Sequence, residues 1–174
     1  MTTREYAFMM VKYEMPSEIK KIQDDIDKDD IYIDPQDEDR YGIEDNAHVT
    51  IVPCLDNDIK LDELKKLLPP LEKCGAYIRD ISVFKCKDYD VLKADVSSNT
   101  LLQTNQKILD KYESFSEYKD SYHPHLTIAY LKKGKGDKYA NAIDLIKLIP
   151  LEPTEYWFTW VEDNHQEKEK TFTK

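Results

Sequence analysis

Two short stretches decide the fold of this chain: HVTIVPCL at residues 48–55 and HPHLTIAYL at residues 123–131. Each is largely apolar, as is typical of a strand, and in each a histidine lies two residues before a threonine. Because residues i and i+2 of a strand point to the same face, the histidine and threonine share a face and the residue between them points to the core. The four polar side chains selected in this way are His48, Thr50, His125 and Thr127.

The two histidine strands also occupy equivalent places in a repeat. Each is preceded by a strand and a helix and followed by a helix and a further strand, which begins at Ala76 in the first repeat and at Thr154 in the second. A unit that recurs in this way predicts two similar lobes related by a pseudo-twofold axis. We therefore expect an α+β fold of two pseudo-symmetric lobes, each a mainly antiparallel sheet with helices on the outside and a cleft between them. The lobes are expected to intertwine in a single domain over residues 1–174.

Hydrophobic periodicity assigns the elements of both repeats. Strands are predicted at residues 6–14, 48–55, 76–87, 90–97 and 123–131, and a closing hairpin is predicted around Asn164. Helices are predicted at 17–28, 58–72, 100–113 and 137–149, the last with Ala142, Ile143, Ile146 and Ile149 facing inward. Residues 24–45 contain many acids and two breakers and are expected to form an exposed loop, with a mobile lid over the cleft as the alternative.

The composition excludes several classes of protein. Hydrophobic residues are 40% of the chain, no apolar stretch approaches the roughly 20 residues that span a bilayer, and no targeting segment is apparent, so no membrane partner is expected. The net charge of −10 opposes binding of long nucleic acid but permits a small anionic substrate in a locally basic cleft. The four glycines form no phosphate-binding motif, and the three cysteines are expected to be reduced thiols, so no cofactor is predicted.

Two histidines and two threonines facing one cleft suit the cleavage of a phosphodiester. In-line cleavage needs a base for the proton of the attacking oxygen and an acid for the leaving oxygen, and histidine can serve as either near neutral pH. Threonine hydroxyls can donate hydrogen bonds to the non-bridging oxygens as charge shifts there. His123 and His125 have a spacing that can ligate a metal, but no convincing carboxylate or cysteine partner is apparent, so no metal is predicted.

With these motifs, the chain resembles the 2H phosphoesterase superfamily, which includes LigT-like RNA 2′,5′ ligases, cyclic phosphodiesterases and 2′,5′-oligoadenylate phosphodiesterases. The resemblance covers nearly the whole chain and is specific at the motifs. More narrowly, YGIEDNAHVTIVPCL and YHPHLTIAYLKKGKGDKY are similar to the phage anti-CBASS proteins of that superfamily, which hydrolyse the cyclic oligonucleotide signals of bacterial immunity. The resemblance implies that His48, Thr50, His125 and Thr127 are catalytic, and that a ribose 2′-hydroxyl can attack first to leave a 2′,3′-cyclic phosphate. The expected location is cytoplasmic, in the host cell if the protein comes from a phage.

Four further residues are candidates for binding the substrate. Tyr13 ends the first predicted strand, where its ring can stack on a base. Trp157 and Trp160 are predicted on opposite faces of the closing strand, so at most one of them is expected to reach the cleft. Lys132 lies in the basic run that follows the second motif and is a candidate phosphate contact. The alternative for the aromatic residues is packing in the core, and for Lys132 it is a solvated turn.

The favoured function is a metal-independent phosphodiesterase that hydrolyses 3′–5′ bonds in small cyclic oligonucleotides, as a phage enzyme against CBASS immunity. An RNA-end 2′,3′-cyclic phosphodiesterase or a 2′,5′-oligonucleotide phosphodiesterase is the alternative, and the acidic charge balance weighs against long RNA. A third hypothesis is a non-catalytic sponge for the same nucleotides. An intact pair of histidine motifs argues against the sponge, because binding alone needs no acid–base pair. The sequence does not specify the bases, the ring size or the oligomeric state.

Overall fold

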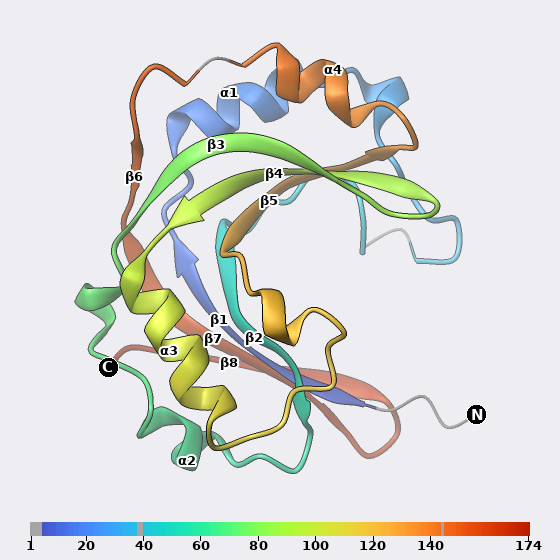
Figure 1. Cartoon of the computed structure of the whole chain (residues 1–174). Coiled ribbons are helices and arrows are strands. Elements are labelled where there is room, and N and C mark those ends of the chain that lie inside the picture. Colours follow the sequence, from blue (N-terminus) through green and yellow to red (C-terminus); the bar gives the residue numbers. More distant parts are fainter. Residues whose placement is uncertain (1–4, 38–39, 144) are drawn as a thin grey trace.

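A single eight-stranded sheet forms the framework of the computed structural model, which describes residues 5–37, 40–143 and 145–174. Its strand order is β6-β3-β4-β5-β2-β1-β7-β8, and neighbouring strands are antiparallel (Figure 1). The strands are β1 (Tyr6–Tyr13), β2 (His48–Asp56), β3 (Ala76–Lys85), β4 (Tyr89–Ser97), β5 (His125–Lys132), β6 (Ile149–Leu151), β7 (Pro153–Glu162) and β8 (Gln166–Phe172). The helices are α1 (Ser17–Asp25), α2 (Leu61–Lys65), α3 (Asn99–Leu109) and α4 (Gly136–Asn141), with 3₁₀ turns η1 (Lys28–Asp30), η2 (Leu71–Cys74) and η3 (Lys119–Ser121).

The sheet consists of two four-stranded halves that meet at one pair of residues. Every other neighbouring pair of strands shares a longer register, whereas β2 and β5 are paired only through Val49 and Leu126. Figure 1 shows the halves turned toward one another like the arms of a C, with the helices on the outside. We call them the β2 half (β2-β1-β7-β8) and the β5 half (β6-β3-β4-β5). This arrangement confirms the predicted α+β fold of antiparallel lobes.

The two sequence repeats exchange segments between the halves. The third strand of the first repeat, β3, pairs with β4, and the last strand of the second repeat, β7, pairs with β1. The loops before the histidine strands also cross over: Ile31 and Ile43 form bridges to β5, and Ser114 forms a bridge to β2. Each half is therefore completed by segments from both repeats, and neither repeat can bury its core alone.

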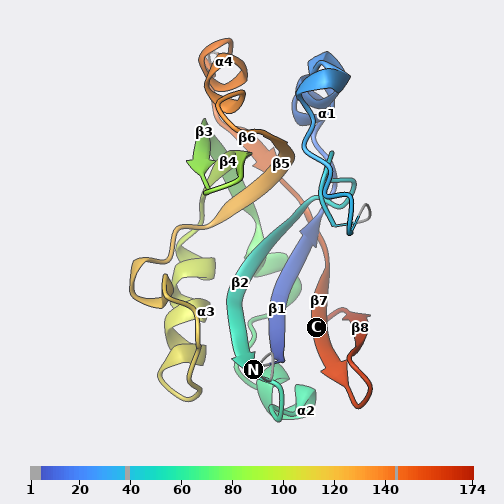
Figure 2. The same cartoon turned by 90° about the vertical axis from the view of Figure 1, so that its right-hand side faces the viewer.

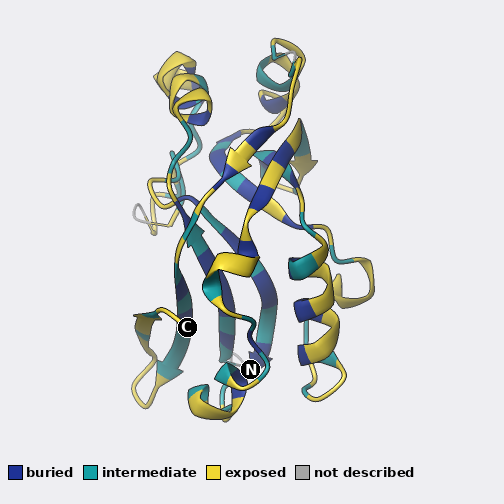
Figure 3. Ribbon diagram, turned by 90° about the vertical axis from the view of Figure 1, so that its left-hand side faces the viewer, coloured by how far each residue is buried: buried dark blue, intermediate teal, exposed yellow. Residues whose placement is uncertain are grey.

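The core lies on the helix-covered face of the sheet. Val49, Ile51, Leu126 and Ile128 are fully buried there, and buried and exposed residues alternate along α3 (Figure 3). Burying one such aliphatic side chain stabilises the fold by about 1.5–3 kcal/mol, so the apolar positions of the motifs decide which face of each strand turns inward. Ser98 fixes the start of α3, because its Oγ accepts a hydrogen bond from the amide of Leu101 at 3.2 Å. No helix among the described residues is long and apolar enough to span a membrane.

Two predicted helices are wrong in length. The helix expected at 58–72 is confined to α2, because the consecutive prolines Pro69 and Pro70 remove backbone donors and fix φ. The helix expected at 137–149 ends at Asn141, and Ile146, assigned to its inner face, is 94% exposed. Ile149 is buried as part of β6, where it pairs with β3. Pairing with the edge of the sheet therefore overrides the helical periodicity at Ile149. Residue 144 of the predicted helix lies outside the described residues.

The 24–45 segment is not a free loop over its described residues. Tyr32 donates its amide to the carbonyl of Tyr130 at 2.9 Å, and the amide of Tyr130 donates to the carbonyl of Gly42 at 2.8 Å. Asp30 is buried and forms ion pairs with Lys135 and Lys138 of the α4 region. These bonds attach the segment to the edge of β5, and residues 38–39 within it lie outside the described residues.

Candidate active site

The four motif side chains lie together where the two halves of the sheet meet. Val49 and Leu126, the central residues of the motifs, are the Cα partners that join β2 to β5. Continuing this antiparallel register by one residue places His48 across from Thr127, and His125 across from Thr50. Both central residues are fully buried, so the flanking polar side chains point away from the core. The histidines and threonines therefore alternate at the corners of a small square around this pair, and the charge of His48 acts on His125 across it.

We call the side of the sheet that bears these four residues the motif face. Figure 2 looks onto the middle of the sheet, where β1, β2 and β5 are seen without a helix in front of them. The helix α3 packs against the opposite side of β2, where its buried Leu101 and Ile108 share the core with Val49. His48 and Thr50 are half-buried and His125 is exposed, so the motif face is accessible to a ligand, whereas the other face is closed by the core.

Both imidazoles are held in the same way by their own chain. Nδ1 of His48 lies 2.8 Å from the carbonyl oxygen of Asn46, and Nδ1 of His125 lies 3.0 Å from the carbonyl oxygen of His123. A carbonyl only accepts, so Nδ1 must be the protonated nitrogen in each ring. Nε2 is then an acceptor when the ring is neutral and a donor when it is charged, which are the two states that acid–base catalysis uses.

A β-bulge follows each motif and explains the isoleucine that the two motifs share. In each motif strand, the threonine and the residue two positions after it have partners on the neighbouring strand. Those two partners are consecutive residues, so one residue of the motif strand is left without a partner. The residue between them is therefore the extra residue of a bulge: Ile51 in β2 and Ile128 in β5. Because both are fully buried, the bulges also anchor the motif strands in the core.

A buried amide side chain from a helix supports each bulge. Asn105 of α3 donates from Nδ2 to the carbonyl oxygen of Ile51 at 2.8 Å, and Gln23 of α1 donates from Nε2 to the carbonyl oxygen of Ile128 at 3.0 Å. The helix of each repeat thus supports the histidine strand of the other repeat. Sequence reasoning did not select these two residues, and the only signal is a polar side chain on the buried stripe of a helix.

Two lysines that sequence reasoning missed flank the square on the motif face. Lys12 of β1 is the Cα partner of His48, and Lys93 of β4 is the partner of Thr127. Only 21% and 16% of these two side chains are exposed, respectively. Each lysine lies near one carboxylate, Glu155 at 3.8 Å from Lys12 and Asp95 at 2.5 Å from Lys93. The signal in the sequence was a single lysine in each strand: Lys12 in the apolar β1, and Lys93 in β4, which also contains Asp90 and Asp95.

The surroundings of His125 lower its pKa. Partial removal from water is the main cause, and the positive charges of Lys93 and His48 act in the same direction. The carbonyl of His123 and the carboxylate of Asp95 act in the opposite direction without cancelling the effect. The residue stays accessible to solvent, as a group that contacts substrate must. A lowered pKa favours the neutral ring at pH 7, so His125 is suited to accept a proton.

The structure places the two tryptophans in different surroundings. The ring of Trp157 lies edge-on to the ring of His48, with 5.2 Å between centroids, and its Nε1 donates to Glu169 at 2.8 Å. Trp160 instead stacks on the buried Phe158 at 5.6 Å and packs against the core. Trp157 is therefore brought to the motif face, and the expectation that Trp160 binds substrate is corrected.

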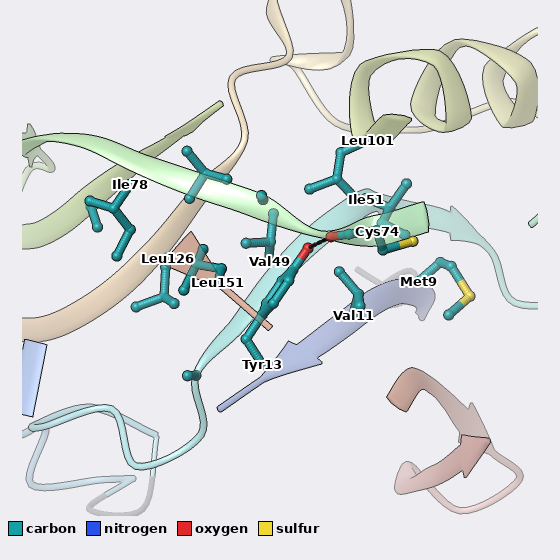
Figure 4. Packing of buried hydrophobic residues seen from close by; sticks show 14 of the residues in the cluster. Met9, Val11, Tyr13, Val49, Ile51, Cys74, Ile78, Leu101, Leu126 and Leu151 are labelled. Carbon is teal, nitrogen blue, oxygen red and sulfur yellow. Dashed lines mark hydrogen bonds between the residues drawn. The ribbon is translucent and has the colours of Figure 1, made fainter. Parts of the chain in front are cut away.

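Tyr13 is not on the motif face. Its side chain is 5% exposed, and its hydroxyl donates to the carbonyl oxygen of Cys74 at 2.7 Å (Figure 4). The preceding residue, Lys12, occupies the motif face, and alternation along β1 turns Tyr13 into the core. The prediction that Tyr13 stacks on a base is therefore wrong.

Lys132 and His123 lie apart from the square. Lys132 is exposed at the far end of β5 and pairs with Tyr89. His123 is exposed, and its carbonyl holds the ring of His125. Within the described residues, no three histidine, cysteine or carboxylate side chains gather as a metal site would require.

One cavity, of about 750 Å³, lies between α3 and the loop at residues 110–122. Its lining contains none of the four motif side chains. Tyr122 lines it and donates its hydroxyl to the carbonyl of Thr50 at 2.8 Å, so the cavity lies behind the motif strand.

Comparison with known proteins places the fold. No protein-family model and no curated protein sequence matches the chain. Among solved structures, Usb1 from Kluyveromyces marxianus matches with a TM-score of 0.51 at 10% identity, over 95% of this chain and 97% of that one. The chain therefore shares the fold of this structure. Two further matches have lower TM-scores: a phosphoesterase (0.48 at 14% identity, over 97% and 96% of the two chains) and E. coli LigT complexed with 3′-AMP (0.44 at 12% identity, over 98% and 96%).

Proposed function

We propose that the chain is a metal-independent phosphodiesterase that hydrolyses 3′–5′ bonds of small cyclic oligonucleotides and so serves phage evasion of CBASS immunity. One observation carries the proposal: histidines and threonines from two separate strands alternate around one square, and each histidine keeps its Nε2 for a ligand. A phosphate centred on this square has an imidazole on either side. That is the requirement for in-line cleavage with protein acid and base groups alone.

The environments of the two histidines support different roles. In the proposed reaction, His125 takes the proton of the attacking oxygen, which is a ribose 2′-hydroxyl or water, because its surroundings favour the neutral ring. The new bond to phosphorus forms as the bond to the 5′ oxygen breaks. His48, protonated on Nε2, then donates its proton to that leaving oxygen. Attack by the 2′-hydroxyl leaves a 2′,3′-cyclic phosphate, and attack by water leaves an open phosphate.

The neighbouring donors suit the charge that develops on the phosphate. The hydroxyls of Thr50 and Thr127 occupy the other two corners of the square and can donate to the non-bridging oxygens. Lys12 and Lys93 add one positive charge from each half of the sheet. Donors of this kind, already in place before the reaction, typically contribute about 10²–10³-fold each to the rate.

The charge distribution favours a small substrate. The chain has a net charge of −10, and the cations nearest the motifs are each close to a carboxylate. This local charge suits one or two phosphates and is too small to overcome repulsion of a long polyanion. Trp157, beside His48, provides an aromatic surface for a base of a cyclic oligonucleotide.

The test is incubation of the protein in EDTA with cyclic dinucleotides, cyclic trinucleotides, 2′,5′-oligoadenylate and 2′,3′-cyclic AMP, with the products identified by mass spectrometry. We expect linear or cyclic-phosphate products from at least one cyclic oligonucleotide. Preferred cleavage of 2′,5′-oligoadenylate or 2′,3′-cyclic AMP would support the alternative enzymes, and tight binding without products would support the sponge. Loss of activity in EDTA that a divalent cation restores would contradict metal independence.

A further inference from the structure

Four tyrosine rings gather around the end of β5 that is remote from His125. The ring of Tyr41 lies 5.1 Å from the ring of Tyr32, and 5.2 Å from each of two others, Tyr89 and Tyr130. Tyr32 and Tyr89 are stacked at 5.0 Å. All four side chains are half-buried, so each keeps part of its surface in solvent. We call these four residues the tyrosine cluster.

The tyrosine cluster continues the motif face of the β5 half. Tyr89 and Lys93 are four residues apart on β4 and therefore share a face. Lys93 pairs with Thr127, and the bulge that follows on β5 returns Tyr130 to the same face. Four strand steps, or about 13 Å, separate Tyr130 from His125 along the sheet.

The loop residues of the cluster are held in register with the strand. The amide of Tyr32 donates to the carbonyl of Tyr130 at 2.9 Å, and the amide of Tyr130 donates to the carbonyl of Gly42, next to Tyr41, at 2.8 Å. These bonds fix the rings of the loop relative to the motif strand. Two cations border the cluster: Arg40 lies 5.6 Å from the ring of Tyr41, and Lys132 is the strand partner of Tyr89.

We propose that the tyrosine cluster is a second nucleobase subsite, which stacks the base on one side of the cleaved phosphate while Trp157 stacks the base on the other side. The proposal rests on the proposed function and adds the requirement for a substrate with two bases. Trp157 belongs to the β2 half and the cluster to the β5 half, so the two aromatic surfaces flank the square of motif residues. Arg40 and Lys132 are placed to meet a second phosphate.

Physical chemistry favours a nucleobase over a purely structural role for this cluster. Tyrosine combines a flat ring for stacking with a polar hydroxyl, which suits a surface that is apolar on one side and wet on the other, whereas a buried satellite core would be filled by aliphatic groups. A stacked base typically contributes about 1–3 kcal/mol, which corresponds to about 5–150-fold in affinity. A partly exposed platform should lie near the lower end of that range.

The experiment compares the affinities of two probes, a 3′,3′-cyclic dinucleotide of adenine and adenosine 2′,3′-cyclic monophosphate. Both are measured by calorimetry in a His48→Ala background that prevents turnover. Tyr41→Leu removes the central ring while keeping apolar bulk, and Tyr89→Leu repeats the change on the strand. Tyr41→Phe keeps the ring. Tyr77→Leu is the matched control, because Tyr77 is 51% exposed on β3 and outside the cluster.

We expect Tyr41→Leu and Tyr89→Leu each to weaken binding of the cyclic dinucleotide about tenfold and to change binding of the mononucleotide less than twofold. Tyr41→Phe and Tyr77→Leu should bind both probes normally. Unchanged dinucleotide affinity in either folded leucine variant, or an equal loss for both probes, would overturn the subsite. Wild-type protein that cleaves none of the cyclic dinucleotides and trinucleotides of the product assay would instead contradict the proposed function, and the binding comparison would still decide the subsite.

Discussion

The two halves of the sheet provide the same scaffold for a histidine but surround it differently. In both, a histidine strand carries a buried bulge, an amide from the opposite repeat bonds to the bulge carbonyl, and Nδ1 contacts a backbone carbonyl two residues earlier. In the β2 half, His48 then has the ring of Trp157 beside it. In the β5 half, His125 has Lys93 and Asp95 nearby and a lowered pKa.

The comparison teaches that backbone symmetry and chemical role are separable. The shared bulges, amides and carbonyls place two equivalent Nε2 atoms on one face. The neighbouring side chains, which the repeat does not preserve, then lower the pKa of His125, so that its ring is more often neutral and able to accept a proton. Changes to the shared features should therefore affect both halves alike, and changes to the neighbours should affect only one.

The largest expected effect is loss of either histidine. His48→Ala and His125→Ala should each lower kcat by about 10²–10⁴-fold, because an acid and a base that act as a unit fail together. Steady-state rates on the best cyclic oligonucleotide would measure this, with dinucleotide affinity as the control for an intact site. A variant that keeps more than about a tenth of the wild-type rate would remove that histidine from the mechanism.

The next effect separates the two tryptophans. Trp157→Ala should weaken nucleotide binding by about tenfold, because a stacking surface beside His48 is lost. Trp160→Ala should leave affinity unchanged and lower the thermal unfolding temperature, because its ring packs on Phe158. Equal affinities in the two variants would mean that Trp157 does not contact a base.

The amides at the bulges test the shared scaffold. Asn105→Leu and Gln23→Leu each remove the side-chain donor to a buried carbonyl, so each should lower the free energy of unfolding by about 1–3 kcal/mol. Urea denaturation measures the loss. Gln103→Leu, at an exposed position of α3, is the control and should change stability by less than about 0.5 kcal/mol. A loss in only one of the two halves would show that the bulges are not equivalent supports.

The smallest effect concerns the neighbours of His125. The rate should follow a bell-shaped pH profile, whose rising limb reports deprotonation of the base. The positive charge of Lys93 lowers the pKa of His125, so Lys93→Met should raise that pKa and move the rising limb to higher pH. Lys12→Met removes the same charge beside His48 and should leave the rising limb in place. A shift of that limb in Lys12→Met alone would reverse the assignment of base and acid.

Much of the site could be read from the sequence because its rules are local. The i, i+2 alternation of a strand requires no partner, so His48 and Thr50 could be placed on one face, with Val49 opposite, from their order alone. The recurrence of strands and helices around each motif was also sufficient for the two-lobed fold. Alternation on its own does not say which face becomes the open one, and this is where the prediction for Tyr13 failed.

Other features were decided only by tertiary structure, because they depend on which strands become neighbours. Lys12 and Lys93 reach the motif face through pairing of β1 with β2 and of β4 with β5, which no local pattern encodes. Pairing of Ile149 with β3 replaced the end of a predicted helix, since ladder bonds and burial outweigh the weak helical preference of a few residues. The sequence by itself determined which residue types stand at the square. The exchange of strands and loops between repeats determined which charges and rings surround it, since those contacts join residues that are far apart along the chain.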